Sequence, residues 1–177
     1  MFKEYLISAK NNNIPVAIYI DSEDTEKFSF GFIQGISNDY VLLADVSPYG
    51  LYDGFQIINC KDIYRCESKS QYNETVQKLY QLQRQSHPIV KLTSNNLILD
   101  LLQYARDNHD VVTIEVHDSK CSDLRGFVEI QDDLVTIKQF DNYGIYNGES
   151  AISFEDITYI SCDSLTEMSI KLLAENS

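Results

Sequence analysis

The chain has 177 residues, of which 44% are hydrophobic and 23% charged, with only 7 Gly and 3 Pro. This composition excludes a disordered or fibrous protein and predicts a globular fold. A net charge of −13 at pH 7 repels phosphate backbones and anionic lipids, so it disfavours generic binding to nucleic acids and membrane surfaces.

The first half of the chain predicts a helix, a set of strands and a second helix, in that order. Apolar residues recur at i, i+3, i+4 and i+7 over residues 2–9, the spacing of one helical face. A similar stripe of Tyr72, Val76 and Leu79 predicts the closing helix. Between the two helices, Asp53-Gly54 supplies the positive backbone angles of a tight hairpin. Segments of alternating β-branched and aromatic residues predict four or five strands, at 16–20, 28–36, 40–46 and 55–66.

The second half predicts the same succession of elements. A helical stripe covers residues 98–105, and Asn147-Gly148 is a second hairpin signal. Ser164 with Glu167 three residues later forms a capping box, which marks the start of a last helix. The apolar stripe of that helix consists of Leu165, Met168 and Leu172. The predicted strand segments are 111–116, 124–130, 134–140 and 151–161.

An internal repeat connects the two halves. The sequence of residues 49–54, Tyr-Gly-Leu-Tyr-Asp-Gly, recurs 94 positions later at 143–148 as Tyr-Gly-Ile-Tyr-Asn-Gly. Upstream, residues 31–33 match residues 126–128 at an offset of 95, which implies one extra residue near Gly35 in the first copy. The helices that open the two halves match at an offset of 96. These matches predict two copies of one domain.

We therefore expect an α+β, mainly β protein with two domains, 1–88 and 89–177. Each domain would consist of a helix, a bent antiparallel sheet of four to five strands, and a helix. In the first domain, the closing helix and the linker after it span Ser70 to about Pro88.

Each copy resembles an Sm-like (Lsm-like) barrel, in which an N-terminal helix precedes five antiparallel strands. The apolar frame of that family's second motif fits residues 58–66 and again 152–160. An SH3-like barrel is an alternative, because small bent sheets share such apolar spacing. The family's first motif is matched in the first copy by Gly31, Ile33, Ile36, Tyr40 and Leu42.

The chain departs from the family where its chemistry is located. Asn59-Cys60 and Ser153-Phe154 replace the Arg-Gly of the second motif. Ser37 and Val41 stand at the base-contacting positions of the first motif. The resemblance therefore implies the scaffold of the family without its uridine-binding pocket.

The expected function is a non-enzymatic protein-interaction or adaptor module. Residues 89–177 hold 6 basic and 16 acidic side chains, a net charge of −10. We expect this half to present an acidic surface to a basic partner, or to mimic nucleic acid toward a protein that binds it; the alternative is a solvated surface that serves solubility. The sequence contains no G-x-S-x-G, phosphate-binding glycine loop or H-E-x-x-H motif, so we expect no enzyme activity. One alternative is a diverged RNA-binding protein that uses Lys61 and Arg65 of the first copy. Another is a ring-forming structural protein that self-associates through open sheet edges.

Four tyrosines are the candidate partner-binding residues, because they flank a hairpin tip in both copies. Tyrosine provides large contact area at low entropic cost. The alternative is that these rings pack on their own sheets. The four residues are Tyr49, Tyr52, Tyr143 and Tyr146.

We expect no cofactor. The four cysteines, at 60, 66, 121 and 162, form no C-x-x-C pair and are interpreted as reduced thiols. The sequence leaves open a metal at His117 and Cys121, which share a predicted loop with Asp118 and Asp123 and have His109 just upstream. Because no apolar run approaches the roughly 20 residues of a membrane helix and the first residues do not resemble a signal peptide, we expect a cytoplasmic protein.

Overall fold

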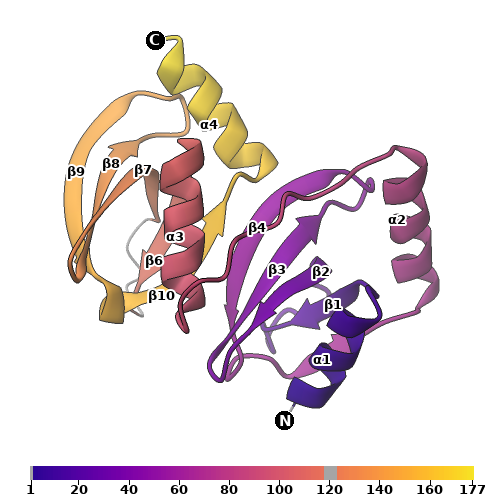
Figure 1. Ribbon diagram of the computed structural model, residues 1–177. Helices are drawn as coiled ribbons and strands as arrows, with labels where there is room; N and C mark the ends of the chain where they lie inside the picture. The colour runs from indigo at the N-terminus through magenta and orange to yellow at the C-terminus, as the bar shows by residue number, and fades with distance from the viewer. Residues whose placement is uncertain (1, 118–122) are drawn as a thin grey trace. The chain divides into compact units, whose positions relative to one another are not determined.

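The computed structural model describes residues 2–117 and 123–177, and the chain divides into two compact units, Met1–Ile89 and Val90–Ser177 (Figure 1). Each unit contains a helix, five strands and a second helix. Within each unit, the described strands pair in antiparallel fashion, which confirms the expected α+β class. No helix in the described part of the chain is long and apolar enough to cross a membrane.

The sheet of the first unit has a helix on each face. Its strands are joined in the order β5-β1-β2-β3-β4. Leu6 and Ala9 of α1 pack with Val16 on one face, and Val76 of α2 packs with Ala17 on the other. Successive β1 residues thus enter opposite cores, as the pleat of a strand requires. The elements are α1 (Lys3–Asn11), β1 (Val16–Tyr19), β2 (Ser29–Ile36), β3 (Tyr40–Val46), β4 (Tyr52–Asn59), β5 (Arg65–Glu67) and α2 (Gln71–Leu82).

The sheet of the second unit has the corresponding order, β10-β6-β7-β8-β9. Leu101, Leu102 and Ala105 of α3 are fully buried, as are Ile114 of β6 and Ile137 of β8. The elements are α3 (Leu97–Asn108), β6 (Val112–Val116), β7 (Leu124–Gln131), β8 (Leu134–Phe140), β9 (Tyr146–Ser153), the short 3-10 helix η1 (Phe154–Asp156), β10 (Ile157–Cys162) and α4 (Leu165–Glu175).

One β-bulge distinguishes the two registers. In the first unit, Ile33 pairs with Leu43 but Gly35 pairs with Leu42, so Gln34 is the extra residue of β2. The pairing of β7 with β8 shows no such shift. The bulge accounts for the extra residue near Gly35 that the sequence predicts. Positions that occupy the same place in the two ladders are called equivalent below.

The hairpin turns lie a few residues before the predicted ones. The N–H of Gly50 donates to the carbonyl of Ser47 at 2.9 Å, and Gly50 has a φ of +70°. Gly54 also has a positive φ, but it lies inside β4, where the pairing with β3 shifts register. The prediction of a turn at Asp53-Gly54 is therefore wrong, because this glycine serves a bulge. Gly144 and Gly148 repeat the arrangement between β8 and β9.

The turn glycines allow each hairpin to press against the last helix of its unit. A Cβ atom added to Gly50 would lie 2.4 Å from the Cβ of Leu79 on α2. At the equivalent Gly144 it would lie 2.5 Å from the Cβ of Leu173 on α4. Both contacts are shorter than real Cβ atoms tolerate, so glycine is required for space as well as for φ.

The capping box of α4 forms as predicted, but the helix buries a different face. The Ser164 hydroxyl accepts from the N–H of Glu167, whose carboxylate accepts from the N–H of Ser164 at 2.9 Å. Glu167 is only 1% exposed and also accepts from the hydroxyl of Ser161. These bonds turn Glu167 and Ile170 inward, so Leu165 and Leu172 of the predicted stripe are 45% and 65% exposed.

Because the hairpin contacts α4 at only one of its two glycines, alanine substitutions at Gly144 and Gly148 should lower the free energy of unfolding by different amounts. Gly144→Ala should lower the free energy of unfolding by about 3 kcal/mol, the sum of a left-handed backbone and an overpacked contact. Gly148→Ala should cost about 1 kcal/mol, because its added Cβ would meet nothing within 4 Å and only the φ of +92° matters. Urea unfolding of both variants measures the difference, and equal costs would contradict the contact.

Candidate binding cavity in the second unit

In the first unit, α2 and the chain segment that follows it cover one face of the sheet. Phe32, Ala44 and Phe55 form one cross-strand row on β2, β3 and β4, and the last two are fully buried. The rest of the cover comes from the chain segment after α2, residues 84–89. This segment is the expected linker, and it contributes the ring of His87.

His87 fits its place as a neutral imidazole. Its Nε2 lies 2.7 Å from the carbonyl oxygen of Asp45, which can only accept, so Nε2 carries the proton. Nδ1 therefore accepts from the hydroxyl of Tyr80 at 2.8 Å. The ring lies 4.6 Å from that of Tyr52 and 5.5 Å from that of Phe55, measured between centroids. Burial lowers the pKa of His87 to about 4.

Two glutamines hold the covering segment on the sheet. The side-chain amide of Gln34, the bulge residue, donates to the carbonyl of Pro88 at 2.7 Å. The side-chain oxygen of Gln85 accepts from the N–H of Tyr52 at 3.0 Å. The segment is thus fixed on both sides of His87.

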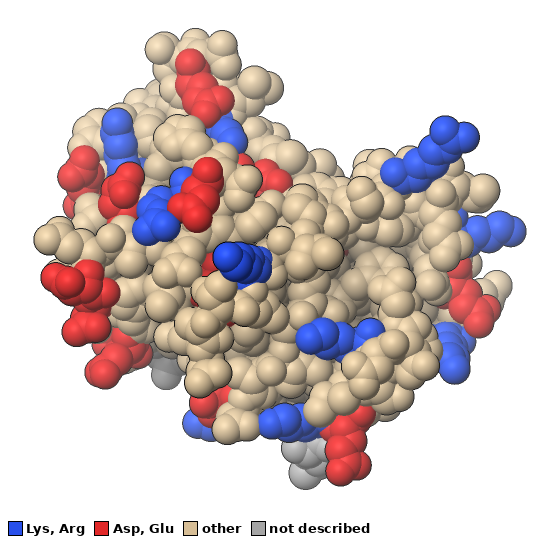
Figure 2. Space-filling view, viewed as in Figure 1, with Lys and Arg blue, Asp and Glu red and all other residues tan. Residues whose placement is uncertain are grey.

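The equivalent face of the second unit is open and charged. Its cross-strand row consists of Phe127, Lys138 and Glu149, in place of Phe32, Ala44 and Phe55. A cavity of about 430 Å³ lies above this row, between the ends of α3 and α4 and the strands β7 and β8. Figure 2 shows acidic and basic side chains interleaved over the part of the molecule where β7 to β9 lie in Figure 1.

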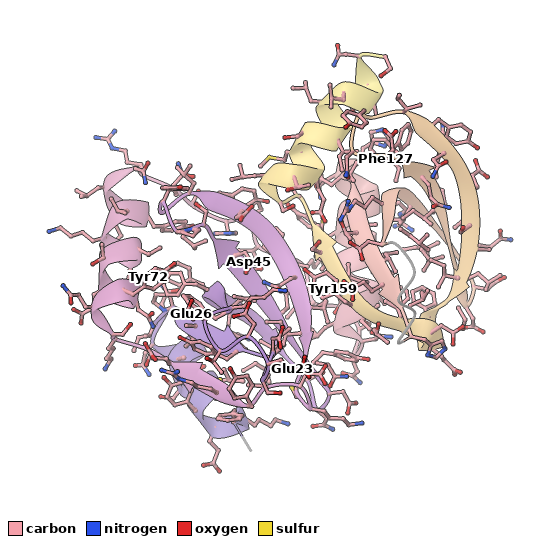
Figure 3. The ribbon with its side chains drawn as sticks, turned by 180° about the vertical axis from the view of Figure 1, so that it is seen from behind. Glu23, Glu26, Asp45, Tyr72, Phe127 and Tyr159 are labelled. Carbon is pink, nitrogen blue, oxygen red and sulfur yellow. The ribbon has the colours of Figure 1, made fainter. Side chains whose placement is uncertain are left out.

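Aromatic rings form one wall of the cavity. His109, in the left-handed conformation at the end of α3, stacks on Phe127 with centroids 4.2 Å apart and ring planes at 5°. Phe127 in turn contacts Phe140 edge-on at 5.6 Å. Figure 3 labels Phe127 on the sheet close to α4, whose Glu175 lies 3.8 Å from His109 Nε2.

Two carboxylates of the cavity have no cationic partner. Asp110 pairs with Lys171 at 3.0 Å, and Arg106 pairs with its neighbour Asp107 at 2.8 Å. Among the described residues, by contrast, none of the basic groups lies within 4.0 Å of the carboxylates of Glu129 and Glu149. Both side chains are exposed and line the cavity.

The lysine that lines the cavity, Lys138, lies close to two aromatic rings. Lys138 Nζ lies 5.9 Å from the centroid of Phe140 and 5.6 Å from that of Tyr146, both within cation–π distance. The lysine therefore leans toward the hairpin, although it is the cross-strand neighbour of Glu149. The cavity offers stacking surfaces and unpaired carboxylates to a ligand.

The thiols that the structure describes are poor nucleophiles. Cys162 is fully buried, and desolvation with the nearby Glu167 and Asp110 carboxylates raises its pKa well above the usual value. Burial also raises the pKa of Cys60, and it raises that of Cys66 to about 11. All three thiols are protonated at neutral pH, and thiol chemistry depends on the thiolate.

The four predicted tyrosines occupy different environments. Tyr49 and Tyr143, at equivalent hairpin tips, are each 77% exposed. Tyr52 packs against Phe55 and the covering His87. Tyr146 is 54% exposed and contacts Phe140 and Lys138. The structure therefore associates Tyr146 with the cavity and places Tyr52 in the cover of the first unit.

Part of the candidate metal cluster lies outside the described residues, including Asp118 and Cys121. Of its other members, His117 Nε2 lies 2.6 Å from an Asp156 oxygen, and Asp123 pairs with Arg125 at 2.7 Å. Within residues 2–117 and 123–177, no three potential ligands are grouped closely enough to hold a metal ion.

Apart from His109, which the sequence places just upstream of the candidate metal cluster, the residues that line the cavity are not candidates from the sequence, although β8 carries a signal for them. The first-copy strand reads Tyr-Val-Leu-Leu-Ala-Asp-Val, in which residues 41–44 are a continuous apolar run typical of a strand buried on both faces. The equivalent strand reads Leu-Val-Thr-Ile-Lys-Gln-Phe, in which apolar and polar residues alternate. The alternation indicates that one face of the second sheet is not buried.

Comparisons of the chain with protein-family models, curated proteins and solved structures found no match. The arrangement of residues in the two units is therefore the basis for a functional proposal.

The covering histidine predicts a pH-dependent stability of the first unit. Because the folded-state pKa is below the unfolded value, the contribution of His87 is complete above pH 6.5 and is lost as the pH falls toward about 4. We expect a loss of about 2 kcal/mol between pH 7 and pH 4, less than the full shift implies because the ring is partly exposed.

The measurement is urea unfolding of the full chain at both pH values, followed through amide signals of β2 to β4. His87→Gln should remove this part of the pH dependence, whereas His109→Gln in the second unit should retain it. An unchanged pH dependence in His87→Gln would show that the imidazole is not the titrating group.

Proposed function

We propose that the protein is a non-enzymatic interaction module built from two Sm-like repeats, with the partner-binding face on the second. One observation carries this proposal: the sheet face that the first unit covers with residues 84–89 is open, charged and hollowed in the second. A cavity of this size is within the range of about 300–1,000 Å³ typical of ligand sites.

The proposed repeat is supported by matching contacts in the two sheets. Both units place a helix before five antiparallel strands, the order of the Sm-like family. A Cβ atom on Gly31 would lie 2.0 Å from the carbonyl oxygen of Ala44, and one on Gly126 would lie 1.8 Å from that of Lys138. In both copies, the second strand therefore needs a glycine for close approach of the third.

A protein partner fits the surface chemistry better than RNA does. The half of the chain that contains the cavity has a net charge of −10, which repels a phosphate backbone. Arg65, one of two basic residues considered for RNA, is paired with Glu67 and lies over the ring of Tyr19 at 4.5 Å. Exposed aromatic rings beside the cavity, such as Tyr146, are the side chains enriched in protein interfaces.

The test is selection of binders from a displayed library of random 12-residue peptides, followed by mapping on the full chain with amide NMR spectra. Peptides should shift signals of Phe127, Lys138 and Glu149. Thr136→Trp, which fills the cavity, should weaken binding by tenfold or more. Thr166→Trp, on the exposed side of α4, is the matched control and should bind as the unaltered chain does.

Amide spectra of each variant establish that it remains folded. Selected peptides that shift only the first unit, or that bind Thr136→Trp equally well, would refute the proposed face. Saturable binding of a uridine-rich RNA at low salt, where electrostatic attraction is strongest, would favour the RNA-binding alternative instead.

A further inference from the structure

In the first unit, a segment of the chain itself occupies the sheet face, and its contacts show what kind of segment this face can bind. The covering segment, residues 84–89, carries one ring, His87, that inserts between Tyr52, Phe55 and Tyr80. The segment is fixed by bonds to the Pro88 carbonyl on one side and to the Gln85 side chain on the other. The face is thus a groove for a short segment with one inserted side chain, and the chain itself supplies that segment.

Substitutions in the second unit change what this groove accepts. Where Phe55 packs on the His87 ring, the second unit has Glu149, and where Tyr80 donates to that ring, it has Ala174. The first change replaces an aromatic contact with a carboxylate. The second removes a large side chain and leaves space beside it.

In the second unit, the charges around the place equivalent to that of the His87 ring favour a positively charged side chain. A side chain entering the cavity would face the unpaired carboxylates of Glu129 and Glu149 and the ring of Phe127. The lining holds two further carboxylates, Glu175 beside His109 and Asp110 paired with Lys171. The opposing cations are engaged elsewhere, Arg106 with Asp107 and Lys138 with aromatic rings. An ammonium or guanidinium group combines attraction to carboxylates with stacking on an aromatic face.

We infer that the cavity of the second unit binds a short peptide segment of a partner protein and receives its lysine or arginine side chain where the first unit holds His87. This inference rests on the proposed function and names the chemistry of the partner. Arginine is the favoured residue, because its planar guanidinium can lie against the aromatic wall of the cavity and donate to a carboxylate in the same pose.

The experiment uses capped peptides with the sequence of residues 85–90, Gln-Ser-His-Pro-Ile-Val, in which the central histidine is replaced. The replacements are arginine, its neutral isostere citrulline, lysine, its apolar analogue norleucine, and glutamate. Each peptide is titrated into the full chain and followed by amide NMR. The arginine peptide should bind about tenfold more tightly than the citrulline peptide, with shifts confined to the cavity residues.

Two matched variants test the carboxylate at the insertion point. Glu149→Gln should reduce the preference for arginine over citrulline by about threefold to fivefold, as expected for a charge pair near the surface. Glu155→Gln removes the same charge outside the cavity and should leave the preference unchanged. Both residues are exposed, so neither change should alter folding.

The outcomes separate this inference from the proposed function. If the display-selected peptides bind the cavity but arginine and citrulline bind equally, the face is a protein-binding site and the cationic specificity is wrong. Tighter binding of the glutamate peptide would also overturn the inference, since it would identify Lys138 and Arg106 as the recognising charges. If neither the selected nor the designed peptides bind the second unit, both proposals fail.

Discussion

Each unit contains one sheet with two faces, and the pleat of the strands sends alternate side chains to each face. The helix that precedes the sheet contributes to the core on one face only, as Leu6 and Ala9 do in the first unit. Side chains on the other face must be covered by further chain or be compatible with water. How the two units meet this requirement determines which of them can accept a ligand.

In the first unit, covering the second face of the sheet depends on several features of the chain. Burying Phe55 contributes about 2 kcal/mol, but only if residues 84–89 remain in place over it. Holding them requires the bulge at Gln34, which reaches Pro88, and a neutral His87 with both ring nitrogens hydrogen-bonded. The pairing of β7 with β8 in the second unit has no such bulge. The bulge therefore occurs in the unit that has the covering segment, where its extra residue, Gln34, holds that segment on the sheet.

The sequence predicts most of the local structure, because strands and helix starts are specified by short-range patterns. The two copies, the capping box at Ser164 and the positive φ of Gly54 and Gly148 all have such signals. The location of the turns does not, since the role of Gly144 depends on contact with Leu173, which is distant in the sequence. The exposed stripe of α4 has a local cause, because hydrogen bonds with Ser161 and Ser164 hold the Glu167 side chain inward.

The cavity could not be predicted from the sequence for a related reason. The sequence alone identified residues 84–88 as part of a linker, and only the fold shows that this segment lies on the sheet. Without that observation, the alternation in β8 predicts an exposed face but not one equivalent to a covered groove. The tyrosines at the hairpin tips are conspicuous as a repeated motif, yet only Tyr146 contacts residues of the cavity.

Charged residues on the open face reconcile solubility with binding. An apolar row like Phe32, Ala44 and Phe55, if left uncovered, would be an exposed hydrophobic patch that promotes aggregation. Lys138 and Glu149 keep the equivalent row hydrated, and His109 stacks on the third member of the row, Phe127. A ligand must then replace the water around these charges, so a merely apolar segment gains little from the cavity. The same substitutions that keep the open face soluble therefore select for a partner that brings a charge of its own.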